Sequence, residues 1–168
     1  ANKAADIDTL LNGILDNSLL LLEYDAAWIN LFEMKNDSRY TRVVCTKNAD
    51  PLLIGRYNAN QITQQPYSHI FENRKKAKDN FNDYFLTISV ETFQNQFLLI
   101  VPFISKDKVV GSLNIVRNSD DPLREEQITA LSTISRQVGI LIDRLNMESN
   151  LKNTADNLNI LFNTIDEM

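Results

Sequence analysis

Two side chains with nucleophilic or metal-binding chemistry, Cys45 and His69, occur once each in this chain. A single thiol cannot form a disulfide within the chain or build a zinc site from several thiolates. Cys45 lies in the apolar run of residues 43–46, which is typical of a small core residue. His69 could ligate a haem iron or contact another tetrapyrrole, but a lone histidine on a short helix is more often a surface or capping residue. Since the sequence also lacks a glycine-rich phosphate loop and a nucleophile elbow, we expect no catalytic residue and no metal ion in this fragment.

Polar side chains also interrupt two apolar stretches, and their chemistry suits binding rather than catalysis. Asn30 lies between Trp28 and Phe32, and Ser112 and Asn114 lie among valines, a leucine and an isoleucine. Such side chains either orient a ligand within apolar walls or bond loop backbone and water. The residues alone leave both interpretations open.

Hydrophobic periodicity predicts a helix at each end of the chain and strands between them. Pro122, followed by Glu125 and Glu126, marks the start of the last helix, because proline and acidic residues favour a helix N-terminus. Residues 48–91 give a weak, loop-rich signal in which we predict only a short helix over residues 67–73. The predicted elements are a helix over 4–23, strands over 26–34, 40–47, 96–104 and 108–117, and a helix over about 122–165. Adjacent antiparallel strands framed by helices indicate an α+β domain.

Two details of the predicted strands concern their edges and turns. Pro102 inside the strand over 96–104 suggests an edge position or a bulge, because proline cannot donate to the ladder. The polar tetrad of residues 105–108 is predicted to close a hairpin, with Lys106 and Asp107 as an exposed tip without function.

Composition limits the classes of partner. The 168 residues, 43% of them hydrophobic, predict one domain plus an additional element. The net charge of −5 argues against nucleic acid, because neutralising phosphates requires a basic face. No apolar run is long enough to span a membrane, and we expect a cytoplasmic fragment without membrane contact. A start without Met predicts a piece of a longer protein.

Taken in order, the motifs of the C-terminal half resemble those of a GAF domain, the small sensory module of bacterial and archaeal signalling proteins. Residues 98–103 match the family's apolar strand, residues 108–115 its hydrophobic-Gly-hydrophobic-Leu strand, and residues 125–142 the helix that follows. Asp25-Ala-Ala27 agrees with the N-terminal half, so the similarity covers roughly residues 8–145. One departure is Pro122-Leu123, where many members have an aromatic residue followed by Ser or Thr; it affects the start of the helix more than the fold.

The resemblance implies an antiparallel sheet with the terminal helices on one face and a ligand pocket on the other, beneath residues 48–91. Side chains alternate along a strand, so the all-apolar face suits the helices and the mixed face suits the pocket. One face of the strand over 108–117 carries Val109, Gly111, Leu113 and Ile115, and the other carries Val110, Ser112, Asn114 and Val116. The residues predicted to contact a ligand are Trp28, Asn30, Phe32, Tyr67, His69, Ser112 and Asn114.

The resemblance also bears on cofactors, and here the family's motifs are missing. Photoreceptor members attach a bilin to a cysteine commonly followed by histidine, whereas Cys45 is followed by Thr46. The Asn-Lys, Phe and Asp-Glu pattern of cyclic-nucleotide-binding members is not recognisable either. Members that reduce methionine sulfoxide use several cysteines. Bilin and cyclic nucleotide are therefore disfavoured, and the ligand stays unknown.

The last helix is too long for the predicted domain to cover. At about 1.5 Å per residue, residues 122–165 span on the order of 65 Å, whereas a domain of about 120 residues has a radius of gyration of about 14 Å. We predict a GAF-like domain over 1–145 and a connecting helix over 146–168. The predicted seam, with a skip at Glu148, comprises Leu131, Ile134, Val138, Leu141, Leu145, Leu151, Ala155, Leu158, Phe162 and Ile165.

A second copy of this helix is the simplest cover for that seam, which gives a parallel homodimer with Leu141, Leu145, Leu151, Leu158 and Phe162 at the contact. The alternative is that the distal residues pack on a downstream domain. Residues 158–168 resemble, over a short stretch, the lead-in helix of a PAS domain. The sequence thus predicts a regulatory module of a sensor histidine kinase or related two-component protein, linked to further signalling domains. A ligand-free dimerisation spacer is the alternative.

Overall fold

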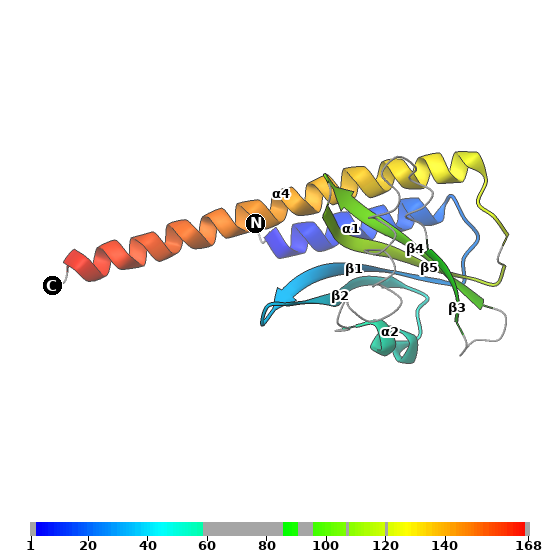
Figure 1. The fold of residues 1–168 in the computed structure, drawn as a ribbon, viewed down its shortest axis with the longest axis horizontal. Coiled ribbons are helices and arrows are strands. Elements are labelled where there is room, and N and C mark those ends of the chain that lie inside the picture. Colours follow the sequence, from blue (N-terminus) through cyan, green and yellow to red (C-terminus); the bar gives the residue numbers. More distant parts are fainter. Residues whose placement is uncertain (1–2, 59–85, 91–95, 107, 120, 167–168) are drawn as a thin grey trace.

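The computed structural model describes residues 3–58, 86–90, 96–106, 108–119 and 121–166 of the chain. A five-stranded antiparallel sheet in the order β2-β1-β5-β4-β3 forms its centre. Helices α1 and α4 lie side by side along one face of this sheet, and α2 lies beyond the other (Figure 1). The elements are α1 (Lys3–Leu19), β1 (Ala26–Lys35), β2 (Ser38–Lys47), α2 (Pro51–Tyr57), β3 (Leu86–Val90), β4 (Gln96–Ser105), β5 (Lys108–Arg117) and α4 (Glu125–Asp166). The predicted α+β class is confirmed.

Most predicted elements are present, and two described elements were not predicted. The strand over 108–117 has the predicted bounds, whereas α1 ends at Leu19, earlier than predicted. Helix α2 and strand β3 both fall in the stretch that gives a weak sequence signal. The predicted helix over 67–73, with Tyr67 and His69, lies outside the described residues.

Helix α2 has a start signal that the periodicity does not reveal. Asp50 caps it, because its Oδ1 accepts a hydrogen bond of 2.7 Å from the Leu52 N–H, and Pro51 occupies the first turn. A capping aspartate followed by proline favours a helix even when only seven residues follow. Leu53 is its buried residue and packs against the sheet.

The sheet separates two apolar clusters. On the helix side, residues of α1 and α4 such as Leu15 and Val138 pack with Ile29 and Leu113 of the sheet. On the other side, the sheet contributes a second cluster around Trp28, to which α2 adds Leu53. Both faces of the central strands are therefore buried. One lies beneath α1 and α4, and α2 packs on the other.

A β-bulge alters the predicted faces at the start of β5. Phe103 pairs with Gly111 and Ile104 pairs with Val109, so Val110 is the extra residue. Val110 consequently joins the helix-side cluster and Val109 joins the opposite one. The prediction had these two valines reversed, because it assumed strict alternation, which a one-residue bulge shifts. From Gly111 onwards the alternation is as predicted.

Pro102 lies where the ladder of β4 becomes irregular. β3 pairs with β4 only from Gln96 to Ile100, so among the described residues Pro102 has a partner strand on the β5 side alone, and the bulge follows immediately after it. The Ser135 hydroxyl of α4 donates a hydrogen bond to the Pro102 carbonyl. That bond satisfies a buried acceptor beside the irregular part of the ladder.

Both hairpins use left-handed turn residues. Asn36 and Asp37 have φ of 51° and 63° between the paired Lys35 and Ser38, which is the geometry of a two-residue hairpin loop. In the second hairpin Ser105 pairs with Lys108, and Lys106 is exposed with φ of 54°. Asp107 lies outside the described residues.

We expect the double substitution Lys106→Asn with Asp107→Gly to leave the free energy of unfolding within about 1 kcal/mol of the parent, because exposed charges contribute little and Asn-Gly suits such a loop. Urea denaturation of both proteins measures this. A loss above about 2 kcal/mol would mean that the tip is packed or paired.

Candidate functional site

The central strands bring four of the predicted ligand-contacting residues together. Trp28 of β1 pairs with Asn114 of β5, and Asn30 pairs with Ser112. Residues directly opposite in an antiparallel pair share a face of the sheet. Trp28 belongs to the cluster on the side away from α1 and α4, so all four side chains lie on that side. Each is fully buried, and Phe32 packs at the margin of the same cluster.

Asn114 makes several hydrogen bonds within this face. Its Nδ2 donates to the Trp28 carbonyl at 3.3 Å and to the Ser112 carbonyl at 3.3 Å. It also lies 3.2 Å from the Ser112 Oγ. These distances exceed the usual 2.9–3.0 Å of an N–H···O bond, so the network is satisfied but loose. Such a network suits the interpretation in which the polar side chains bond the protein itself.

Trp28 carries a polar group into this apolar face. Its indole N–H is buried and has no hydrogen-bond partner among the described residues. The ring lies with its centroid 5.3 Å from that of Tyr57, with the two planes inclined by 30°. Burial raises the pKa of the Tyr57 hydroxyl. An unpaired buried donor costs about 1–3 kcal/mol, so Trp28 is the position on this face where an acceptor on a bound molecule would gain most.

Tyr57 and Leu53 of α2 also pack on this face, and neither was predicted to do so. The Thr41 hydroxyl of β2 donates to the Tyr57 carbonyl, and the Asn58 Oδ1 accepts from the Val43 N–H at 3.0 Å. These bonds hold the end of α2 against β2. The capping pair Asp50-Pro51 was the available signal, since a helix starting there brings Leu53 and Tyr57, four residues apart, to one side. The predicted contacts Tyr67 and His69 lie outside the described residues.

Cys45 lies on the other side of the sheet, in the core beneath the helices. Burial, together with the negative charges of Asp8 and Asp16, raises the pKa of its thiol from 9.0 to about 11. A thiol in such surroundings is a poor nucleophile at neutral pH. Within the described part of the chain, no cluster of histidine, cysteine and acidic residues is arranged to hold a metal ion.

The raised pKa of Cys45 predicts a loss of stability at alkaline pH. An unfolded thiol with a pKa near 9 gives up its proton before the folded thiol with a pKa of about 11, so between these values the folded state binds more protons. Stability is therefore complete below pH 9 and falls as the pH rises towards 11, by up to about 2 kcal/mol.

Unfolding measured between pH 8 and 11 tests this when the Cys45→Ala variant is compared with the parent. Lysines and tyrosines titrate in both proteins, so only the difference between the two slopes reports on Cys45. Equal slopes would show that the folded thiol titrates as it does in the unfolded chain.

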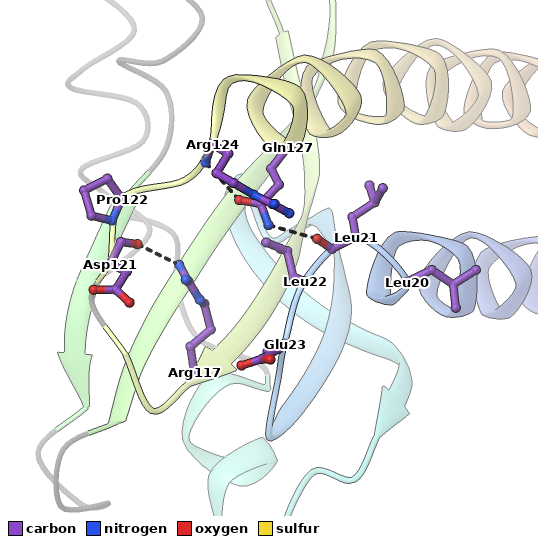
Figure 2. Close-up of a pocket in the computed structure, with 9 residues that line it drawn as sticks. All are labelled: Leu20, Leu21, Leu22, Glu23, Arg117, Asp121, Pro122, Arg124 and Gln127. Carbon is purple, nitrogen blue, oxygen red and sulfur yellow. Dashed lines mark hydrogen bonds between the residues drawn. The ribbon is translucent and has the colours of Figure 1, made fainter.

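A hollow lies elsewhere, where the chain enters β1 and leaves β5 (Figure 2). Its volume is about 560 Å³, and it is lined by Leu20, Leu21, Leu22, Glu23, Arg117, Asp121, Pro122, Arg124 and Gln127. The Gln127 Oε1 accepts from the Arg124 N–H at 2.8 Å, and its Nε2 donates to the Leu21 carbonyl at 3.0 Å. Gln127 thus caps the start of α4 and joins it to the segment between α1 and β1. Two arginines and two acidic residues balance the charge of the hollow.

Three residues of α4, each one turn apart, fix the helix to β4. Ser135 binds the Pro102 carbonyl, as described above. An added Cβ at Gly139 would lie 2.3 Å from the Ile104 carbonyl oxygen, so helix and strand backbones are in direct contact there. Asp143 is buried, accepts a 2.9 Å hydrogen bond from the Ser105 hydroxyl, and lies 3.6 Å from the Lys108 Nζ. This contact row ties α4 to the bulge, whose Pro102 in turn pairs with Ser112 of the candidate face.

Beyond this row α4 leaves the body of the domain. Every side chain of residues 146–165 is exposed, and Figure 1 shows the helix projecting past the sheet. The predicted long helix is present, and it runs unbroken through Glu148 to Asp166. Considering only the described residues, no helix combines the length and apolar character that a membrane span requires.

A family model described as GAF domain matches residues 4–143, which is most of the chain. The chain belongs to the GAF domain family. The match ends close to the predicted domain limit at residue 145, just before α4 projects from the body. The PAS-like lead-in over residues 158–168 and the division at residue 146 stay predictions. Among curated proteins, none matches this GAF domain significantly by sequence.

Solved structures confirm the GAF fold. The GAF domain/HD domain protein from Geobacter sulfurreducens superposes with a TM-score of 0.64 at 11% identity, over 86% of this chain and 97% of that one. The GAF domain of a two-component sensor histidine kinase from Bacillus halodurans gives 0.57 at 18% identity, over 84% and 97%. A type II free methionine-R-sulfoxide reductase from Thermoplasma acidophilum gives 0.55 at 11% identity, over 83% and 92%. At identities this low, the likeness concerns the fold alone.

Proposed function

We propose that this GAF domain is a regulatory module that binds a small molecule or a partner and relays the signal through a homodimer of α4. The observation that carries this proposal is the projection of α4 from the body with large hydrophobic side chains exposed, including Leu151, Leu158 and Phe162. A helix fixed to the sheet at one end and uncovered at the other can pass a movement of the domain to whatever covers it. The Bacillus halodurans neighbour, a two-component sensor histidine kinase, supports a place in a protein of that kind, with further signalling domains downstream.

The proposed ligand face is the side of the sheet with Trp28, Asn30, Ser112 and Asn114. Its support is the combination of apolar walls with a few polar groups, above all the buried indole N–H of Trp28. A ligand there should offer a hydrogen-bond acceptor to that N–H and a flat apolar part to Trp28 and Tyr57. The contact row on α4 gives such a ligand a physical connection to the helix, because Ser112 pairs with Pro102 of the bulge.

The alternative is a ligand-free GAF domain that acts as a dimerisation spacer. The hydrogen bonds of Asn114 to Ser112 and to the Trp28 carbonyl favour it, because they occupy polar groups that a ligand would otherwise use. Catalysis is not part of the proposal. The Thermoplasma acidophilum neighbour is a reductase, but the single buried Cys45 of this chain cannot supply both a nucleophile and a resolving thiol.

Native mass spectrometry and an absorbance spectrum of the purified chain test the two functions together. A co-purified mass or a visible band supports ligand binding, and a clean apo spectrum supports the spacer. Trp28 is the only tryptophan, so its fluorescence reports on the proposed face directly during ligand screening. Light scattering at tens of micromolar tests the dimer, and a monomer at that concentration would rule out the proposed relay.

A further inference from the structure

The exposed hydrophobic residues of α4 follow a different line from the seam that the sequence predicts. Leu131 and Val138 of that seam are buried in the domain's own core, and Ile134 packs against it. They are therefore not available to a partner helix. Leu141 and Leu145 are partly buried near the body. The proximal half of the predicted seam is thus the face with which α4 binds its own sheet, and only the distal half projects past the body.

A second line of residues runs without a phase break along the exposed side of α4. Its large hydrophobic members, between 48% and 70% exposed, are Ile140, Met147, Leu151, Leu158, Leu161 and Ile165. With Arg144 and Thr154 included, successive members are separated by four and three residues in strict alternation. That is a heptad repeat, with Arg144, Leu151, Leu158 and Ile165 at the a positions and Ile140, Met147, Thr154 and Leu161 at the d positions.

This line lies away from the domain body. At 3.6 residues per turn, Ile140 and Leu151 lie on the side of the helix opposite to Leu131, Val138 and Ile142, which pack into the core. A partner on this side would not displace the sheet. The heptad line also begins at Ile140, beside the contact row at Gly139 and Asp143, so it reaches from the body to the end of the described helix.

We propose that this heptad line binds the same line of a second copy, in a parallel, in-register coiled coil. The inference rests on the proposed function and specifies which residues make its dimer. A repeat of 3.5 residues favours a supercoiled helix partner, since a helix packing on a globular domain typically shows a wider apolar stripe. The flanking positions that face each other in a parallel pair are Asp143 with Glu148, Asn150 with Ala155 and Asn157 with Phe162, so no like charges flank the distal half of the seam. The acidic pair lies where the helix leaves the domain, and its Asp143 is already buried against Ser105 and Lys108.

Two polar residues of the heptad line, Arg144 and Thr154, are expected to weaken the coiled coil locally. Arg144 at an a position would face its own copy where the helix leaves the domain, and Glu148, one turn on, can pair with it. Thr154 at a d position interrupts the apolar core midway. A single polar residue at such a position typically fixes the register at some expense of stability. We propose a parallel orientation because, in the proposed relay, the C-terminal ends of both helices must lie at the same end of the coiled coil.

Cysteine cross-linking of the full chain tests the register. In a Cys45→Ser background, single cysteines are placed at Leu151, Leu158 and Leu161 on the line, and at Asn153 and Asp156 on the outer side as controls. In a parallel, in-register dimer each residue on the line meets its own copy, so mild oxidation should give covalent dimers for the first three and none for the controls. Cross-links at the outer positions, or at only one position of the line, would overturn this register while leaving the dimer of the proposed function intact.

Charge substitutions give an independent measurement. Leu158→Asp should raise the dimer dissociation constant at least about 100-fold, whereas Ile160→Asp, at an exposed c position, should change it less than about 3-fold. Both side chains are exposed in the single copy, so folding should be unaffected, which circular dichroism checks. Equal effects would overturn the seam. A monomeric parent chain would overturn the proposed dimer itself and would point to a downstream segment as the cover.

Discussion

The Gly139→Ala variant should unfold at least about 3 kcal/mol more easily than the parent, or fail to accumulate as folded protein. An alanine Cβ at this position would lie 2.3 Å from the carbonyl oxygen, 2.4 Å from the carbonyl carbon and 2.6 Å from the nitrogen of Ile104. All three are backbone atoms of β4 and cannot rotate away as a side chain would. To relieve the overlap, α4 must lift from the bulge, and that strains the neighbouring contacts of Ser135 and Asp143.

Gly13→Ala is the matched control. Gly13 is also in a helix, but an added Cβ there meets nothing within 4 Å. Alanine should therefore stabilise the protein by about 0.5–1 kcal/mol through its higher helix propensity and the lower entropy of the unfolded chain. Urea denaturation followed by circular dichroism measures both variants. If Gly139→Ala gained stability as Gly13→Ala does, α4 could not be in backbone contact with β4.

The elements with strong periodicity could be predicted from the sequence. Apolar residues in β5 mark it from Lys108 to Arg117, and the turn residues Asn36 and Asp37 mark the first hairpin. Helix α2 was missed because it is too short to show a helical period, although Asp50-Pro51 signals its start. β3 was missed although its five residues alternate between apolar and polar side chains, which is a signal of strand length that the sequence-based prediction did not use.

The alternation of residues predicts which side chains lie on which face of the sheet, except where the pairing of two strands shifts that alternation. The bulge at Val110 depends on how β4 pairs with β5, and no property of β5 alone reveals it. The predicted seam of α4 shows a related limit of periodicity. Leu131 and Leu151 are equally apolar in the sequence, and only the position of the sheet shows that one belongs to the core and the other to the surface. Joining the two sets into one line required a skip at Glu148, which the exposed heptad line does not have.

The pairing also connects the candidate face physically to the projecting helix. Ser112, on the candidate face, pairs with Pro102, and the Pro102 carbonyl is bound by Ser135 of α4. The irregular end of β4 thus pairs with a strand of the candidate face and also bonds directly to α4. A shift of β5 on ligand binding would reach α4 at the contact row, beside the start of the proposed heptad line.

Trp28→Ala should cost about 3–5 kcal/mol of unfolding free energy, because Trp28 is fully buried and its removal leaves a large cavity between β1, β5 and Tyr57. Trp28→Phe should cost only about 1–2 kcal/mol. Phenylalanine keeps most of the ring contact, and it deletes a buried N–H that has no partner among the described residues, which offsets part of the lost packing. Circular dichroism must follow the unfolding, since both variants lack the only tryptophan.

The pair of Trp28 variants also separates the sensor from the spacer. If a bound molecule accepts a hydrogen bond from the indole N–H, Trp28→Phe should fold and dimerise as the parent does but lose the co-purified mass in native mass spectrometry. A Trp28→Phe variant as unstable as Trp28→Ala would mean that the N–H is bonded within the protein, because the loss of a satisfied donor would then add to the loss of packing. A Trp28→Phe variant that keeps a co-purified mass at full occupancy would show that the ligand is held without the indole, and the proposed contact to Trp28 would be wrong.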